Sequence, residues 1–157
     1  MDDFSAAPSK VPWPPVIMAG AVLLALILSW LVPIPLSPET VEAFRGLGVV
    51  FILLGLGLDI WTFQTFRRHA TTVRPDRSAA ALATDGPFRY SRNPIYIGNG
   101  LLILGLGLAF ANLWLVLLTP AVFVLLDRVA IAREEKHLEA RFGEEYRAFK
   151  ARVRRWI

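Results

Sequence analysis

The sequence predicts an all-α integral membrane protein with four transmembrane helices and a C-terminal amphipathic helix on the cytoplasmic side. Hydrophobic residues make up 55% of the 157 residues, and the mean hydropathy is +0.48. Both values are high for a soluble domain of this size, and the apolar residues occur in blocks long enough to cross a bilayer. The basic residues gather in two segments, which predicts the topology.

The composition also excludes several classes of site. The chain contains no cysteine, so it has no disulfide framework, no thiolate nucleophile and no cysteine-bound metal. The N-terminus carries Asp2 and Asp3 where a secretory signal would carry Lys or Arg. We therefore expect a single membrane domain, without a cleaved signal peptide and without a metal site.

The first two predicted spans are residues 16–32 and 43–63. The first run is just long enough to cross a bilayer and ends at Pro33. Ser37 followed by Pro38 predicts a helix start, with Ser as the N-cap and Pro as the first helical residue.

Asp59 lies near the far end of the second span. A carboxylate is costly in lipid, so its side chain should face other helices or water. It could be a partner for a cation or a substrate. Alternatively, it could lie at the membrane interface and pair with Arg67 or Arg68.

The third and fourth predicted spans, residues 96–110 and 113–130, form a hairpin because only Ala111 and Asn112 separate them. Residues 131–157 should then form the amphipathic cytoplasmic helix and a tail. Two Leu-Gly-Leu-Gly-Leu segments, 54–58 and 104–108, predict close packing between helices in lipid.

Fifteen of the 17 Lys and Arg residues lie in two segments, residues 67–92 and 128–155. This distribution places both segments, and with them both termini, in the cytoplasm. Trp156 and Ile157 follow a pair of arginines and predict an interfacial anchor. A basic tail beside a membrane helix favours anionic lipid, and not nucleic acid, as the partner.

The stretch 84–98 is polar, aromatic and basic between apolar segments, and it indicates a site within the predicted cytoplasmic loop 67–95. Pro87 and Pro94 should hold Gly86 and Asn93 extended at two fixed corners. Because the hairpin is antiparallel, this stretch should meet Glu134 and Glu135 at the cytoplasmic surface. The resulting recess would combine a polar end with an apolar one.

The residue types at this recess suit transfer of a group from a preactivated donor. The sequence shows no Ser-His-Asp spacing, no metal-ligand set and no phosphate loop. Aligning two reactants can by itself supply much of a rate enhancement. An Arg for a carboxylate, a Glu for an amine and aromatic rings for an adenine or a sulfonium would hold S-adenosylmethionine.

Two motifs carry a family resemblance. Gly86-Pro87-Phe88-Arg89-Tyr90-Ser91-Arg92-Asn93-Pro94-Ile95-Tyr96-Ile97-Gly98, followed by Glu134-Glu135 and Phe142-Gly143-Glu144-Glu145-Tyr146, resembles the isoprenylcysteine carboxyl methyltransferase family. The phospholipid N-methyltransferases are relatives of that family. The resemblance covers about half of the chain.

The resemblance implies an S-adenosylmethionine-dependent methyltransferase that admits a lipophilic acceptor from the bilayer. Arg92, Glu134 and Glu135 would be its catalytic residues, without a preference between the two glutamates. The implied cofactor-binding residues are Leu82, Ala83, Phe88, Arg92, Asn93, Pro94, Tyr96 and Glu134.

This chain departs from the family pattern at two positions. Asn93 stands where the family often has His, and Asn cannot titrate, which argues against a general acid or base there. Ala130 stands where eukaryotic members have an Arg for the substrate carboxylate, a role that Arg128 or Arg133 could take.

Several alternatives stay open at this point. The acceptor could be small or lipophilic, and methylation could occur on O, N or S. The chain could also be a non-enzymatic membrane subunit or carrier, or a nicotinamide-dependent membrane reductase. The excess of Arg over Lys and the short length favour a bacterial inner-membrane protein.

Overall fold

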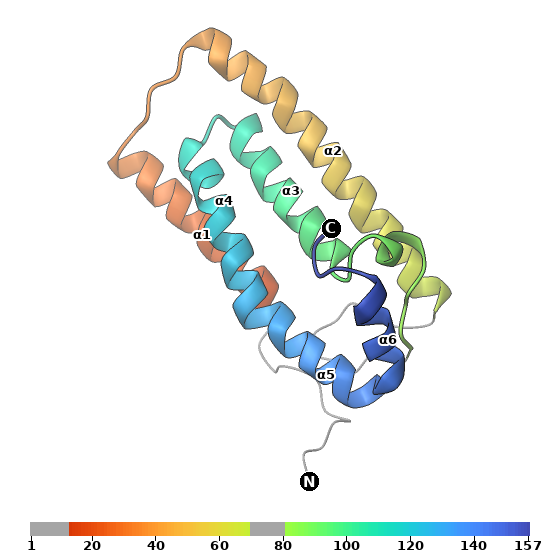
Figure 1. Cartoon of the computed structure of the whole chain (residues 1–157). Helices are drawn as coiled ribbons and strands as arrows, with labels where there is room; N and C mark the ends of the chain where they lie inside the picture. Colours follow the sequence, from red (N-terminus) through yellow and green to blue (C-terminus); the bar gives the residue numbers. More distant parts are fainter. Residues whose placement is uncertain (1–12, 70–80) are drawn as a thin grey trace.

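The computed structural model describes residues 13–69 and 81–157, and all regular secondary structure in these ranges is helical. The main helices are α1 (Trp13–Leu31), α2 (Pro38–Arg68), α3 (Pro94–Ala109) and α4 (Leu113–Leu125), and the last continues beyond Leu125. They run antiparallel in the spatial order α1, α4, α3, α2 (Figure 1).

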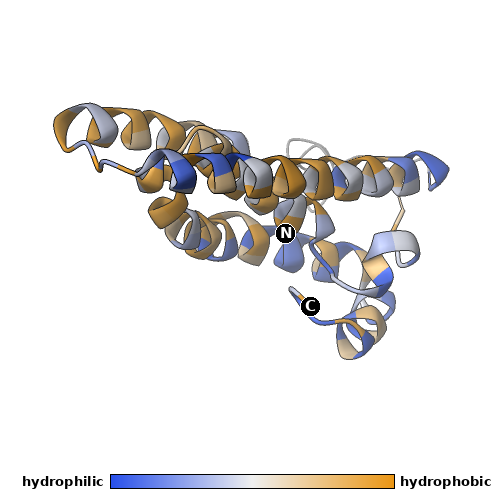
Figure 2. Ribbon diagram, turned by 90° about the horizontal axis from the view of Figure 1, so that it is seen from above, coloured by the Kyte–Doolittle hydropathy of each residue, from blue (hydrophilic) through white to orange (hydrophobic). Residues whose placement is uncertain are grey.

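Three helices are long and apolar enough to cross a membrane: α1, α2 and the continuous helix Leu113–Phe142. Helix α3 is apolar but has only 16 residues. The structure therefore supports a multi-pass membrane protein but does not confirm the predicted fourth span. Hydrophobic residues cover most of the long helices, and hydrophilic ones gather near the C-terminus and at helix ends (Figure 2).

Helix α2 is longer at both ends than the predicted span 43–63. It starts at Pro38 because the hydroxyl of Ser37 accepts a hydrogen bond from the backbone N–H of Thr40, at 3.3 Å. This confirms the predicted helix start. At its far end the helix continues to Arg68, beyond the apolar run.

Helix α4 continues without a break through a π-helical segment, Leu126–Ile131, into α5 (Ala132–Phe142), so no helix end marks the predicted membrane boundary between residues 130 and 131. The break comes at Gly143, whose φ of 52° suits glycine. A further helix, α6 (Glu144–Arg152), follows. The segment 131–157 thus holds two helices and a tail instead of one helix.

The predicted hinge between α3 and α4 is confirmed. Ala111 has a φ of 53°, and the side chain of Asn112 accepts a hydrogen bond from the backbone N–H of Leu115, at 3.0 Å. Asn112 is therefore the N-cap of α4. At the same end of the bundle, the indole of Trp114 donates to the carbonyl of Val32, at 2.8 Å, and ties α4 to α1.

Glycines bring α2 and α3 into backbone contact. A Cβ added to Gly55 would lie 2.8 Å from the carbonyl oxygen of Gly98, and one added to Gly105 would lie 2.9 Å from that of Gly48. Within the repeated segments, Gly55 and Gly105 thus have the predicted packing role. Gly57 has open space around its Cβ position, and it is not part of this contact.

Asp59 faces α3 from within α2. It is 9% exposed, and a Cβ on Gly98 would collide with its Oδ1, which has no hydrogen-bond partner. The predicted pairing with Arg67 or Arg68 is wrong, because Arg68 instead lies 3.8 Å from Asp85 and also donates to Thr65.

The loop between α2 and α3 is only partly described: residues 70–80, with Arg74 and Arg77, lie outside the described ranges, as does the acidic N-terminus. Its later part forms a 3₁₀ helix, η1 (Gly86–Arg89). Gly86 has a φ of 55°, so the predicted extended conformation is wrong at this residue. Its Cα packs against Thr65, so that η1 lies on α2.

His69 and Asp85 close this loop at its base. The imidazole of His69 lies 2.7 Å from a carboxylate oxygen of Asp85. This hydrogen bond is the main reason that the pKa of Asp85 is lowered. The contact joins the C-terminal end of α2 to the residue that precedes η1.

Candidate active site

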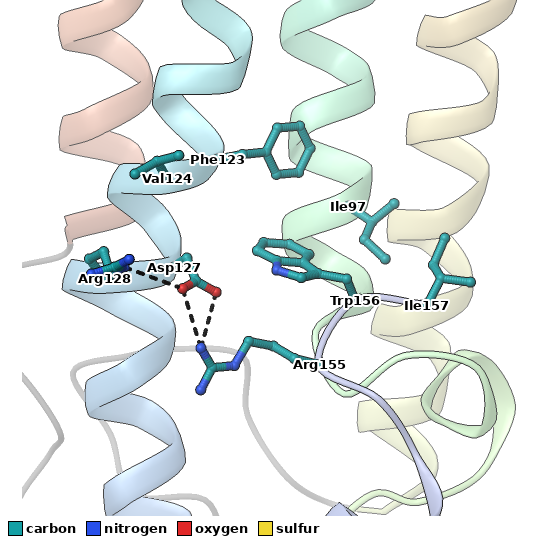
Figure 3. Close-up of a pocket in the computed structure, with 8 residues that line it drawn as sticks. All are labelled: Ile97, Phe123, Val124, Asp127, Arg128, Arg155, Trp156 and Ile157. Atoms are coloured by element: carbon teal, nitrogen blue, oxygen red, sulfur yellow. Dashed lines mark hydrogen bonds and ion pairs between the residues drawn. The ribbon is translucent and has the colours of Figure 1, made fainter.

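A groove of about 830 Å³ opens between α3 and α4 beside the C-terminal tail, residues 153–157 (Figure 3). Ile97 of α3, Phe123 and Val124 of α4, and Trp156 of the tail form apolar walls. Asp127 and Arg128 form its polar end together with Arg155. The groove therefore lies next to the segments that the sequence singled out.

Arg92 lies in the turn that leads into α3. Its backbone N–H donates to the carbonyl of Arg154 at 3.0 Å, and its guanidinium lies 3.0 Å from Oε1 of Glu135. The side chain is 9% exposed, and its Nε is buried without a hydrogen-bond partner among the described residues. A buried charged group with a free donor is costly unless a further acceptor binds there.

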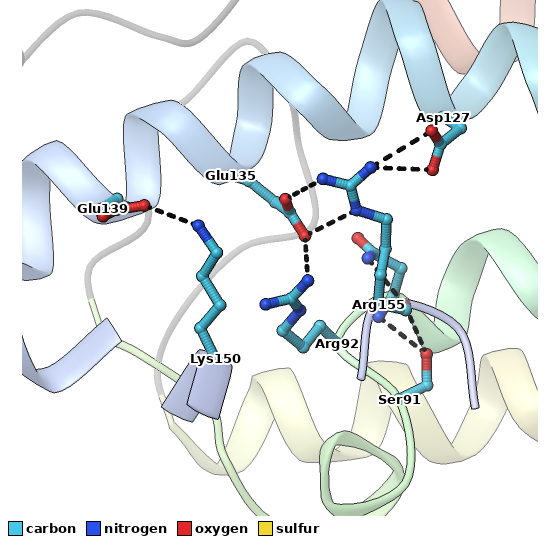
Figure 4. Close-up of polar contacts among 8 residues, drawn as sticks. Ser91, Arg92, Asp127, Glu135, Glu139, Lys150 and Arg155 are labelled. Carbon is cyan, nitrogen blue, oxygen red and sulfur yellow. Dashed lines mark hydrogen bonds and ion pairs between the residues drawn. The ribbon is translucent and has the colours of Figure 1, made fainter. Parts of the chain in front are cut away.

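Glu135 pairs with two arginines (Figure 4). Besides Arg92, it accepts hydrogen bonds from Nε of Arg155 at 3.2 Å and from the same guanidinium's NH2. The opposite edge of Arg155 donates to both oxygens of Asp127, each at 3.2 Å. The hydrogen bond to Glu135 raises the pKa of Arg155, which stays charged and joins the two acids.

The tail is also held by its backbone. The carbonyl of Arg155 accepts hydrogen bonds from the hydroxyl of Ser91, at 3.1 Å, and from the side-chain amide of Asn93, at 3.0 Å. The Ser91 hydroxyl in turn accepts from the backbone N–H of Asn93. These contacts fix the tail against the start of α3, where Pro94 is the first helical residue.

Glu134 has a different environment from Glu135. Its Oε2 accepts a hydrogen bond from the hydroxyl of Tyr96, at 2.9 Å. Tyr96 is 5% exposed and belongs to the core between α1, α3 and α4. No ion pair neutralises Glu134 within the described residues, whereas Glu135 is saturated by two guanidinium groups. Glu134 is the glutamate that is left free to bind a cation.

The predicted cofactor residues at the base of the loop lie in a separate hydrophobic cluster. Ala83 and Phe88 pack with Tyr146 and Phe149 of α6, and Leu82 lies at the edge. The ring of Phe88 also packs edge-on against Phe66 of α2, at 5.1 Å between centroids. This cluster holds α6 against η1 and α2.

Tyr146 links this cluster to the charged residues. It is 1% exposed, and burial is the main cause that raises its pKa. The charges of Glu135 and Glu134 raise it further, while the charge of Arg92 lowers it. The hydroxyl of Tyr146 therefore stays protonated at neutral pH, within the electrostatic reach of all three predicted catalytic residues.

The structure brings the predicted loop residues together with the two predicted glutamates. Arg92 pairs directly with Glu135, Asn93 is linked to Glu135 through Arg155 of the tail, and Tyr96 binds Glu134. Leu82, Ala83 and Phe88 lie in the adjoining cluster and not among these charges. The sequence analysis missed the roles of Ser91, Asp127, Tyr146 and Arg155. Asp127 follows an apolar run, and Arg155 belongs to the pair of arginines that was interpreted as part of an interfacial anchor. Their opposite charges were the signal that could have predicted a contact between them.

Arg128 and Arg133 are the two arginines near Ala130 that could take the role of the family's substrate-binding Arg. Ala130 is buried, and the side chain of Arg128 is 80% exposed beside Asp127 at the groove. Arg133 stacks on the ring of Trp13, 5.8 Å from its centroid. Of the two arginines, only Arg128 lines the groove.

Comparison with known proteins identifies a family that includes most of these site residues. The phospholipid methyltransferase family matches residues 44–145, which is 102 of the 157 residues. The chain is also similar to an uncharacterised protein of Haemophilus influenzae, with 51% identity over 37 residues, or 23% of this chain and 59% of that protein. The chain thus spans about three fifths of that relative's length. No solved structure matches the chain.

The family match includes the turn before α3, the α3–α4 hairpin and both glutamates. It confirms the resemblance inferred from the motifs, since the phospholipid methyltransferases were named there as relatives. The chain therefore belongs to the phospholipid methyltransferase family.

Proposed function

We propose that this protein is an S-adenosylmethionine-dependent methyltransferase of the bacterial inner membrane, with both termini in the cytoplasm and a small or lipophilic acceptor. Two observations within the described residues carry the proposal: the buried guanidinium of Arg92 pairs with Glu135 but its Nε has no partner, and Glu134, next in sequence to Glu135, has no ion pair. The family match makes a reductase or a non-enzymatic subunit the weaker alternative.

The residues fit the chemical groups of the cofactor. The free Nε of Arg92 suits a carboxylate, and the carboxylate of Glu134 suits an ammonium group. The bound cofactor would supply an activated methyl group on a sulfonium. Phe88 and Tyr146 are buried in the adjoining hydrophobic cluster, so in this structure they support the site and do not face a ligand.

The chain's own contribution is binding, orientation and exclusion of water. Tyr96 fixes the carboxylate of Glu134 by its hydrogen bond, and Glu135 fixes the guanidinium of Arg92. Both arrangements are largely buried, so charges there act at a low dielectric. Alignment of a preactivated donor with an acceptor in such a site accounts for catalysis without a titrating base.

The proposal is tested by calorimetric titration of the detergent-purified protein with S-adenosylmethionine and S-adenosylhomocysteine. Arg92→Ala and Glu134→Gln should each weaken binding by about ten- to a hundredfold, the value of one hydrogen bond to a charged group. Arg147→Ala is the matched control, because Arg147 also pairs with glutamates but lies on the surface. Its affinity should equal that of the wild type.

Two results would count against this function. Folded wild-type protein that binds neither compound would contradict the methyltransferase itself. Unchanged affinity in Arg92→Ala and Glu134→Gln, with binding in the wild type, would contradict the assigned site.

A further inference from the structure

The guanidinium of Arg155 bridges two carboxylates (Figure 4). One edge of its fork binds both oxygens of Glu135: Nε donates to Oε1 at 3.2 Å, and Nη2 donates to Oε2. Its Nη1 lies 3.2 Å from each oxygen of Asp127. Because the guanidinium is planar and held on both sides, it fixes the rotation of the Glu135 carboxylate as well as its position.

The π-helical segment explains how one guanidinium reaches both acids. Asp127 and Glu135 are eight residues apart. In a regular α-helix, eight residues at about 100° each would leave the two side chains about 80° apart around the axis. The segment Leu126–Ile131 has wider turns with i→i+5 hydrogen bonds, so each residue there turns the helix by a smaller angle. The two carboxylates therefore lie closer to the same face of the helix.

The bridge leaves Arg92 only partly paired. Its Nη2 lies 3.0 Å from Oε1 of Glu135, but Nε, on the same edge of the fork, has no partner among the described residues. A carboxylate that pairs with Arg frequently binds both nitrogens of one edge. Here the second oxygen of Glu135 is already bound by Arg155. The bridge thus accounts for the free Nε of Arg92.

We propose that Arg155 is a positioning residue of the methyl-donor site: it holds Glu135 so that Nε of Arg92 stays available for the carboxylate of the donor. The identity of this ligand rests on the proposed function. Without the Arg155 guanidinium, the Glu135 carboxylate would turn and accept hydrogen bonds from both Nε and Nη2 of Arg92. The donor would then compete with Glu135 for Nε.

Two substitutions separate this role from attachment of the tail. Arg155→Ala removes the bridge but keeps the backbone carbonyl that accepts from Ser91 and Asn93. It also keeps the edge-on contact of Trp156 with Phe123, at 5.4 Å between ring centroids. Arg155→Lys retains the positive charge, but a single ammonium group cannot reproduce the two-sided fork.

The first measurement needs no ligand. It follows the NMR signal of the Arg92 Nε–H group in the full chain in detergent, identified by its loss in Arg92→Lys. In Arg155→Ala this signal should move downfield, because Nε gains a carboxylate acceptor. Arg154→Ala is the matched control: its side chain is exposed, and the backbone carbonyl that accepts from Arg92 is kept. There the signal should stay at its wild-type position.

The second measurement compares calorimetric affinities for S-adenosylmethionine and for decarboxylated S-adenosylmethionine. In the wild type the carboxylate should strengthen binding about ten- to a hundredfold, the value of one hydrogen bond to a charged group. Arg155→Ala should lower this ratio about three- to tenfold, towards the ratio of Arg92→Ala, and Arg155→Lys should give an intermediate value. Arg154→Ala should keep the wild-type ratio. A general loss of stability would weaken both compounds alike and leave the ratio unchanged.

An unshifted Nε–H signal or a wild-type affinity ratio in Arg155→Ala would overturn the positioning role. An equal fall of the ratio in Arg154→Ala would overturn it too, because the charge of the tail would then suffice as the cause. If Arg155→Ala does not fold, a wild-type signal and ratio in Arg155→Lys would be decisive against the bridge. A shifted signal in a protein whose wild type binds neither compound would instead contradict the proposed function, so the two failures are distinguishable.

Discussion

Glu134 and Glu135 are adjacent in sequence, yet their side chains have different partners. Glu135 is 6% exposed and is held by Arg92 and Arg155, so its charge is neutralised by neighbours. Glu134 has the hydroxyl of Tyr96 as its hydrogen-bond partner. Glu135 therefore holds Arg92 and Arg155 together, whereas Glu134 has no cationic partner within the described residues.

Glu135→Ala should therefore destabilise the protein. Arg92 and Arg155 would lose the carboxylate that they share, and the free energy of unfolding should fall by about 3 kcal/mol. This is the lower end of the range for a broken buried ion pair, because Arg155 is one third exposed. The matched control is Glu139→Ala, which also loses two cations, Arg147 and Lys150, but at an exposed position. The measurement is the free energy of unfolding in detergent.

Equal loss of stability in the two variants would contradict the structural role of Glu135. A Glu135→Ala protein that keeps its stability but no longer binds S-adenosylmethionine would assign Glu135 directly to the cofactor instead.

Some residue-level contacts could not be predicted from the sequence, because the partners lie far apart along the chain. Arg155 meets Glu135 and Asp127 across 20 and 28 residues, and no local period relates a tail to a helix. Asp59 faces another helix, as predicted, because its side chain lies on the same face as Gly55, one turn earlier in α2, and this face packs on α3.

At the scale of the elements, the position of α3 depends on its close packing against α2. The two helices touch through pairs of glycines, Gly48 with Gly105 and Gly55 with Gly98. The approach brings the start of α3, with Asn93 and Tyr96, to a fixed position relative to α2 and η1. Packing between helices in lipid relies on such contacts, since lipid offers no hydrophobic driving force for association.

Gly55→Ala should destabilise this contact, because the new Cβ would lie 2.8 Å from the carbonyl oxygen of Gly98 and 2.9 Å from Leu102. Overpacking of this kind typically costs about 1–3 kcal/mol. Gly57→Ala is the control within the same segment, since its Cβ meets nothing within 4 Å. There the higher helix propensity of Ala should leave the stability unchanged or raise it.

The midpoint of thermal unfolding in detergent measures both variants. A Gly55→Ala protein as stable as Gly57→Ala would show that α2 and α3 are not in backbone contact.

Local signals predicted some element boundaries well and others poorly. The side chains of Ser37 and Asn112 each accept a hydrogen bond from a free backbone amide in the first turn of a helix. The starts of α2 and α4 were therefore predicted correctly. The charges of Asp127 and Arg128 predict a change of surroundings near residue 130 and not a helix end, and the helix continues there through a π-helical segment. The break at Gly143, which divides residues 131–157 into two helices, was not predicted.

At the scale of the whole molecule, the site and the basic residues share one end of the bundle. The loop 32–37 and the hinge between α3 and α4 lie at the opposite end, near which Arg45 is the one Lys or Arg among the described residues (Figure 1). The charge rule places the basic end in the cytoplasm. A soluble methyl donor would then reach the site from that side.

The absence of cysteine from the sequence makes this orientation directly testable. Ser37→Cys and Ala148→Cys place single thiols at exposed positions at the two ends. In intact bacterial cells, a membrane-impermeant maleimide should label the thiol at position 37 but not the one at 148. Permeabilisation should expose both, and the reverse pattern would invert the topology.

The attachment of the tail has a consequence for biogenesis. Residues 153–157 emerge from the ribosome after α1 to α4, yet they supply the carbonyls and the guanidinium that close the site. These helices can therefore insert and pair while the polar residues at this end are still hydrated. Closure of the site then follows insertion of the four helices, and a nascent chain that has not yet reached residue 153 would lack it.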